Sequence, residues 1–160
     1  MANIGWGKPR VFVKDADDTG AKWIELPTAV EGTTSLATTK GDKVEAKIEG
    51  GENEDVRFNR NTYALTLEIR AAKGRNKPIQ ENDGIIDHNY EVYLQPEDPE
   101  VSGFHIPTAR VSVEDTWSAE NGGTWIYTFD ALRSGDAKQL EWGVVTVTGS
   151  GDNITNVAIN

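Results

Sequence analysis

The sequence has no cysteine, only two histidines and no long apolar run, and each of these features excludes a class of protein. Without cysteine there are no disulfides and no thiolate ligands, and two histidines alone argue against a zinc site. No run is long enough to span a membrane, and the opening MANIGWGKPRVFVK lacks the apolar segment of a signal peptide. We therefore expect a protein made in the cytoplasm, not secreted by a signal peptide and without a membrane partner.

Catalytic patterns are also missing. His88 and His105 are the only histidines, and no G-x-S-x-G motif supplies a nucleophile for either of them. We therefore expect both to be solvated or loop residues. Carboxylate pairs carry little weight in so acidic a chain, and no glycine-rich stretch joins a strand to a helix as a phosphate loop requires. These absences predict a protein that is not an enzyme and has no cofactor and no metal centre.

Positive charge is scarce, and its distribution limits the possible partners. The net charge is −10 over 160 residues, and Arg110 is the only Lys or Arg between Ile79 and Asp130. Tight binding of nucleic acid depends on basic side chains that neutralise phosphates, so we do not expect it here. Two interpretations stay open: the acidic surface serves solubility, or it lets DNA slide past without adhering.

One acidic segment resembles the start of a calcium-binding loop. Asp15-Ala-Asp17-Asp18-Thr19-Gly20 places oxygen ligands at alternate positions before a glycine. The closing bidentate glutamate is missing, because Leu26 occupies its position and Glu25 lies one residue away. The pattern favours an ordinary Asx-rich turn and leaves calcium binding by Asp15 and Asp17 as an open alternative.

Alternation of apolar and polar residues is the strongest structural signal in the chain. It runs through Lys43–Glu49 (KVEAKIE) and Thr62–Ala71 (TYALTLEIRA), and a period of two predicts half-buried antiparallel strands. The pair Gly50-Gly51 and the polar ENED after it predict the bend that follows the first run. The Lys and Glu side chains of Lys43–Glu49 are expected on the outer face, opposite complementary charges on a neighbouring strand.

About nine short strands and almost no helix are predicted, in one domain spanning residues 1–160. The fold class is therefore all-β: an antiparallel β-sandwich or small barrel with one short helix at Pro78–Asp83. Asn121-Gly122-Gly123 predicts a hairpin turn, and prolines bracket an acidic loop with Glu97, Asp98 and Glu100. The other expected strands are Lys8–Lys14, Lys22–Leu26, His88–Gln95, Arg110–Trp117, Thr124–Leu132 and Leu140–Thr148.

Five tryptophans suggest two opposed interpretations. Exposed tryptophans on a β-sandwich form platforms for sugars, which would make the protein a carbohydrate-binding module. However, Trp117, Trp125 and Trp142 lie on alternating strands beside other apolar residues, which favours a place in the core or in an interface. Trp6 and Trp23 complete the set.

Two segments of the chain together carry a family resemblance: LPTAVEGTTSLATTKGDKVEAKIEGGENEDVRFNRNTYALTLEIRAAKGR and RVSVEDTWSAENGGTWIYTFDAL. Both resemble phage tail tube (major tail) proteins, which are related to the type VI secretion tube protein, hemolysin-coregulated protein. The first contains a T-T-x-L-x-T-x-x-G-D-K segment and an acidic E-G-G-E turn before a long alternating strand, and the second resembles the later hairpin of the same proteins.

The resemblance implies a non-enzymatic subunit of a virion tail. Its partners would be further copies of itself, in hexameric rings that stack into a tube, and other tail components. DNA would pass through as cargo without specific binding. The segment expected to touch a neighbouring subunit is the loop Gly50, Gly51, Glu52, Asn53, Glu54 and Asp55.

Overall fold

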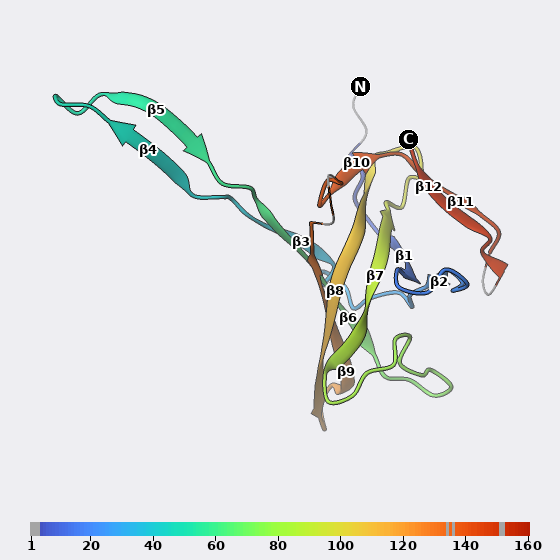
Figure 1. Cartoon of the computed structure of the whole chain (residues 1–160). Helices are drawn as coiled ribbons and strands as arrows, with labels where there is room; N and C mark the ends of the chain where they lie inside the picture. Colours follow the sequence, from blue (N-terminus) through green and yellow to red (C-terminus); the bar gives the residue numbers. More distant parts are fainter. Residues whose placement is uncertain (1–3, 134, 136, 151–152) are drawn as a thin grey trace.

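The structure, a computed structural model that describes residues 4–133, 135, 137–150 and 153–160, is built almost entirely of β-strands (Figure 1). None of the described residues forms a helix long and apolar enough to cross a membrane. The strands are β1 (Arg10–Asp15), β2 (Ile24–Glu25), β3 (Ser35–Thr39), β4 (Lys43–Lys47), β5 (Asn53–Phe58), β6 (Thr62–Arg70), β7 (Ile85–Gln95), β8 (Gly103–Ser118), β9 (Gly122–Ala131), β10 (Glu141–Gly143), β11 (Val145–Thr148) and β12 (Asn156–Ile159).

One antiparallel sheet forms the body of the molecule, in the order β2-β1-β7-β8-β9-β6-β3, and β10 also pairs with β8. Its two edges do not join. The prediction of an all-β fold is therefore confirmed, with a sandwich-like open sheet, and the predicted alternative of a small closed barrel is not confirmed. β11 and β12 form a separate hairpin, and so do β4 and β5.

The sheet bends around its main core. Leu65, Leu67 and Ile69 of β6 are buried in the same cluster as Val11 and Val13 of β1, although β1 and β6 are not neighbours in the sheet. Strands from both halves of the sheet therefore share one apolar interior. The alternation predicted for Thr62–Ala71 is confirmed at Leu65, Leu67 and Ile69, which face this core, whereas Tyr63 is only partly buried and Ala71 is exposed beyond the end of β6.

A second, smaller core lies on the opposite face of β1 and β7. Phe12 and Tyr93 alternate with the residues of the main core, and they pack against Val145, Ile154 and Val157 near the β11–β12 hairpin. β1 is thus covered on both faces, which explains its continuous apolar run Val11–Val13.

The central strand β8 begins seven residues before the predicted strand Arg110–Trp117. Its first half was not predicted, because a bulge there interrupts the regular alternation of buried and exposed positions. Ile106 and Ala109 both face the core, and they pair with Val92 and Tyr90 of β7 across a shift in register. Pro107, which has no N–H for the ladder, lies within this bulge. The shift changes the parity of the buried positions from even to odd.

The helix predicted at Pro78–Asp83 is wrong. The segment is irregular and ends in a tight turn at Asp83-Gly84, where both residues have positive φ angles (51° and 84°). Ile79 anchors it by entering the main core, and its carbonyl accepts a hydrogen bond from the hydroxyl of Tyr127 at 3.4 Å. Burial of one apolar residue and the Asp-Gly turn determine the path, since a single helical turn gains few hydrogen bonds of its own.

The predicted strand Leu140–Thr148 is divided in two. Val144 exchanges backbone hydrogen bonds with Asn160, at 3.0 and 3.1 Å, and so joins the chain's last residue to the sheet. β10 before it pairs with β8, while β11 after it pairs with β12.

Candidate assembly interface

β4 and β5 form an arm, residues 43–58, that extends away from the rest of the molecule (Figure 1). Every residue of β4 is exposed, and in β5 only Val56 is partly covered. The prediction that Lys43–Glu49 is a half-buried strand is therefore wrong in its burial, although the strand itself is present. No part of the described chain outside the arm packs against its faces closely enough to bury them.

The arm carries an apolar row on each of its two faces, because residues paired across an antiparallel ladder share a face. On one face, Val44 and Ala46 of β4 lie opposite Arg57 and Asp55 of β5, and Ile48 continues the apolar row toward the turn. On the other face the arrangement is reversed, and Val56 and Phe58 of β5 lie beside Glu45 and Lys43 of β4. Val44, Ile48 and Phe58 remain 43%, 47% and 56% exposed.

The charges of β4 pair along the strand rather than across it. Glu45 contacts Lys43 at 2.6 Å and Lys47 at 3.5 Å, and these cations lower the pKa of its carboxyl, with the Lys43 hydrogen bond as the largest cause. Its cross-strand partner is Val56. The expected pairing of opposite charges between strands is therefore wrong. This arrangement was not predicted from the sequence, because the polar ENED was assigned to the bend and no strand was assigned to the residues after it, so β5 and its apolar row were not anticipated.

The turn of the arm begins where the Gly50-Gly51 signal placed it. Both glycines have left-handed φ angles, 96° and 86°, that other residues rarely adopt. The N–H of Ile48 donates to the carbonyl of Glu52 at 2.9 Å and closes the turn. Of the six residues predicted as an intersubunit loop, only Gly50, Gly51 and Glu52 are loop; the last three form the first half of β5.

The root of the arm, residues 40–42 and 59–61, is tightly packed. The N–H of Asn59 donates to the carbonyl of Asp42 at 2.8 Å, and the N–H of Gly41 donates to Oδ1 of Asn61 at 3.0 Å. A Cβ at Gly41 would collide with the carbonyl oxygen of Asn59. The two strands of the root approach so closely that only glycine fits there, which fixes how the arm leaves the sheet.

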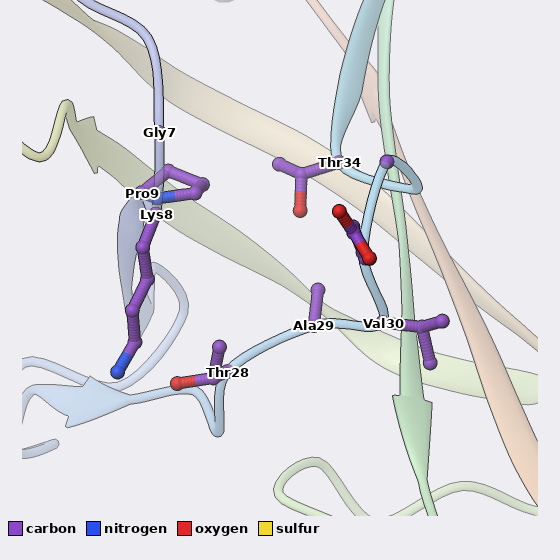
Figure 2. A pocket seen from close by; sticks show the side chains of 9 residues that line it. Gly7, Lys8, Pro9, Thr28, Ala29, Val30 and Thr34 are labelled. Carbon is purple, nitrogen blue, oxygen red and sulfur yellow. The ribbon is translucent and has the colours of Figure 1, made fainter.

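A groove lies beside the N-terminal segment of the body. Its volume is about 500 Å³, and its lining is mostly apolar. Figure 2 shows Pro9 and Lys8 on one side of it and Thr28, Ala29 and Thr34 on the other. Thr34, which lines the groove, directly precedes Ser35, the first residue of the edge strand β3.

The acidic loop with Glu97, Asp98 and Glu100 is a loop as predicted, between β7 and β8. It also holds the N-terminal segment, because a carboxylate oxygen of Glu97 accepts a hydrogen bond from the N–H of Lys8 at 2.6 Å. Asp98 accepts from the N–H of Glu100 at 3.1 Å, which closes a local turn. Two of the three residues are therefore occupied in shaping the loop.

Two of the tryptophans placed in the core or an interface are exposed. Trp117 and Trp142 are 76% and 64% exposed, so their assignment to the core is wrong, whereas Trp125 packs against the main core. Trp142 pairs with Phe104, and Trp117 lies thirteen positions after Phe104 in β8. At about 3.3 Å per residue the two rings are roughly 40 Å apart along the strand, too far to stack a common ligand.

The two histidines have different environments. His88 is exposed, as expected, although it lies in β7. His105 is buried in β8, where the expectation of a solvated residue is wrong. Its ring stacks on Tyr93 with centroids 4.0 Å apart, and it lies 2.9 Å from Glu91 and 3.3 Å from Glu141. The contact with Glu141 joins β10 to the sheet.

Asp15 and Asp17 form a turn, as the favoured interpretation predicted. Oδ1 of Asp15 accepts from the N–H of Asp17, and Oδ2 of Asp17 accepts from the N–H of Asn89, both at 2.9 Å. Ligand atoms of Asp15, Asp17 and His88 lie within 4.8 Å of one another on the surface. Leu26, at the position of the closing calcium ligand, is buried in the main core, so the calcium loop is incomplete here as well.

Comparison with known proteins adds no relative to this description. No family model matches the chain, and no curated protein matches its sequence. Any functional conclusion therefore depends on the arm, the sheet edges, the charge distribution and the resemblance of the two sequence segments described above.

Proposed function

We propose that the protein is a structural subunit that assembles with copies of itself, in the manner of a phage tail tube. The observation that carries the proposal is the arm. A two-stranded hairpin alone is marginally stable in water, because it has no third strand or core to bury its apolar side chains. An arm of this length with an apolar row on each face gains its stability when another chain covers it.

The open edge of β3 is a second support. Its sequence, Ser35–Thr39 (SLATT), contains no charge and no proline, the devices that usually protect an edge from pairing with another chain. The opposite edge strand, β2, is only two residues long. In a ring, β3 supplies the unpaired N–H and C=O groups through which the sheet of one subunit continues into the next.

The charge distribution suits a conduit for DNA. A net charge of −10 and the scarcity of basic residues between Ile79 and Asp130 disfavour adhesion to phosphates. Together with the resemblance of the Leu26–Arg75 and Arg110–Leu132 segments to tail tube proteins, this supports stacked rings, hexameric in that family, around a passage for DNA. Other tail components would cap the tube, and the protein would reside in the virion.

Assembly as a function of concentration tests this proposal. Electron microscopy and sedimentation of the concentrated protein are expected to show rings or tubes. A variant in which residues 42–59 are replaced by a two-residue Asn-Gly turn between β3 and β6 is expected to stay monomeric with the thermal unfolding of the intact body. A wild-type protein that stays monomeric at every concentration, even beside other tail components, would refute the proposal.

The alternative of a carbohydrate-binding module gains no support from the tryptophans. Among the described residues the aromatic contacts are Trp23–Tyr93, Tyr93–His105, Phe104–Trp142 and Tyr127–Phe129, so no two tryptophans pair. A platform needs adjacent exposed rings. Titration with soluble oligosaccharides while tryptophan fluorescence is recorded is expected to give no saturable change.

A further inference from the structure

We infer that His105 is a pH-sensitive clasp, which holds β10 against the sheet while its ring carries two protons and loosens β10 when the ring loses one. The clasp acts on the C-terminal part of the chain and is independent of the proposed self-assembly. It makes the attachment of β10, and of the hairpin that follows it, depend on pH.

Both nitrogens of the His105 ring face a carboxylate. Nε2 lies 2.9 Å from Oε1 of Glu91 in β7, and Nδ1 lies 3.3 Å from Oε2 of Glu141 in β10. An ionised carboxylate only accepts hydrogen bonds, so each of these contacts needs an N–H on the ring. Neutral imidazole has one N–H and the imidazolium has two, which means that only the charged ring donates to both carboxylates.

The position of the ring is fixed by its packing. His105 is 8% exposed, and its ring stacks on Tyr93 with centroids 4.0 Å and planes 7° apart. In the sheet His105 pairs with Tyr93 on one side and with Glu141 on the other, so β8 holds the imidazole between β7 and β10. A ring that loses its second proton therefore keeps a lone pair directed at one of the two carboxylates, and the two groups repel each other.

The contact that fails is the one to β10. The contact with Glu91 is the shorter of the two, and the side chain of Glu91 is 28% exposed, against 41% for Glu141. The remaining N–H therefore stays with Glu91, and Nδ1 is left facing the carboxylate of Glu141. Only three residues of β10, Glu141–Gly143, pair with β8, so repulsion at one of these pairs weakens the attachment of the whole strand.

The weakened strand continues into the β11–β12 hairpin (Figure 1). Val145 and Val157 of this hairpin cover Phe12 and Tyr93 in the second core. The clasp therefore controls how firmly the cover of the second core is held to the sheet.

The clasp shares its face of the sheet with a defined set of charged or titratable groups. Residues paired across the ladder share a face, and on the face of His105 these groups are Arg10 and Lys14 of β1, Glu25 of β2, Glu91 and Tyr93 of β7, and Glu141 of β10. The described residues of the β11–β12 hairpin, which packs against this face, add no acidic or basic side chain. Histidine is the one residue type among them that ordinarily changes charge between pH 5 and 8.

The other groups on this face have partners of their own. Nε of Arg10 lies 2.8 Å from Oε1 of Glu25, and the cation of Lys14 lies 5.6 Å from the centre of the Trp23 ring. Burial, with a smaller contribution from a neighbouring carboxylate, raises the pKa of the Tyr93 hydroxyl, so this group stays neutral throughout the range of histidine. The contact between β8 and β10 is therefore controlled by the proton on the ring itself.

Amide hydrogen exchange, followed by NMR at a concentration where the protein is monomeric, tests the clasp at β10. Protection of the β10 amides, corrected for the intrinsic effect of pH on exchange, is expected to fall about five- to tenfold from pH 5.5 to 8.5, because one charge-assisted hydrogen bond is lost at a partly exposed site. The amides of β6 and β9 are the internal reference and are expected to keep their protection. Constant protection of β10 across this range would overturn the inference.

The protonation state of the ring is measured in the same samples. Long-range correlation of the ring nitrogens and carbon-bound protons of His105 is expected to show two protonated nitrogens at pH 5.5 and one, Nε2, at pH 8.5. His88→Gln removes the only other histidine and assigns the signals. A His105 ring with a single proton at pH 5.5 would overturn the inference, since a carboxylate would then carry the proton that joins the three groups.

Glu141→Gln separates the clasp from a general effect of pH. The amide of glutamine accepts a hydrogen bond from a protonated Nδ1 and donates one to an unprotonated Nδ1, so this variant is expected to hold β10 equally well at pH 5.5 and 8.5. His88→Gln is the matched control, because it removes an exposed histidine of β7 and is expected to leave the pH dependence at β10 intact. A Glu141→Gln variant that keeps the pH dependence of the unmodified protein would show that the clasp is wrong.

Discussion

β6 in the body and β4 in the arm have the same kind of sequence and different surroundings. In both strands apolar and polar residues alternate, and yet Leu65 and Leu67 are buried while Val44 is nearly half exposed. β6 lies between β9 and β3 in a sheet that bends around a core, whereas β4 has only β5 beside it. A period of two shows that a strand has two different faces, but it does not show whether the chain itself supplies a cover for one of them.

The difference has an energetic meaning. Burying a Leu, Ile or Phe side chain contributes about 1.5–3 kcal/mol to stability. The body gains this on folding, whereas the apolar side chains of the arm stay largely exposed. Under the proposed self-assembly, the arm would gain the same stabilisation only when another chain covers it.

Truncation of one phenylalanine in each region is expected to give the largest contrast. Phe129→Ala leaves a cavity in the main core, and we expect the free energy of unfolding of the monomer to fall by about 3–5 kcal/mol. Phe58→Ala removes an exposed ring, and we expect a change within about 0.5 kcal/mol. Denaturant unfolding at a concentration where the protein is monomeric measures both. Equal losses would show that the arm is packed against the body in solution.

Alkaline pH is expected to destabilise the body. Burial raises the pKa of Tyr127 to about 12, and burial, with a contribution from Glu91, raises that of Tyr93 as well. A pKa raised in the folded state means that the neutral form is preferred there. The associated stability is therefore complete below pH 10 and is lost as pH rises from 10 through 12.

Tyrosine absorbance near 295 nm, followed together with circular dichroism, measures this effect. Tyr127 and Tyr93 are expected to ionise only as the body unfolds, and Tyr127→Phe is expected to move the unfolding to higher pH. Ionisation of all four tyrosines near pH 10 without unfolding would contradict the burial of these two rings.

The smallest expected effect is confined to the turn of the arm. Gly50→Ala places a Cβ at a left-handed φ, which costs about 1 kcal/mol. We expect faster amide hydrogen exchange at Ile48, whose N–H closes the turn, with unchanged exchange in β6 and β9. Glu49→Ala, beside it and free of this backbone constraint, serves as the control. Loss of protection in β6 as well would show that the arm and the body unfold together.

Local signals in the sequence were sufficient for much of the fold. The alternation in Thr62–Ala71 identified β6, and the glycines at Asn121–Gly123 and Gly50–Gly51 identified both hairpin turns, because left-handed backbone conformations require glycine. These elements therefore follow from residues that are close together in the chain.

The features that were missed depend on contacts distant in sequence. The bulge at Pro107 changes which residues of β8 face the core, from even-numbered to odd-numbered positions, where β8 pairs with β7. Ile79 packs into the main core next to Tyr127, and this contact prevents its segment from forming a helix. The candidate site was misplaced for the same reason. The apolar row of β5 is visible only once Val56 is known to lie opposite Glu45.

The arm also has a consequence for the order in which the chain folds. Twenty-two residues separate Thr39 at the end of β3 from Thr62 at the start of β6, which must pair. Hairpins form in about 1–10 μs, well before sheets that join distant segments, such as β1 with β7. When β4 and β5 zip from their turn, they bring the ends of β3 and β6 together and remove most of the loop-closure entropy of that pairing. An arm that adds little to the final stability of the monomer is thus expected to speed its formation. Stopped-flow refolding after Gly50→Ala, slower with unfolding unchanged, would reveal this.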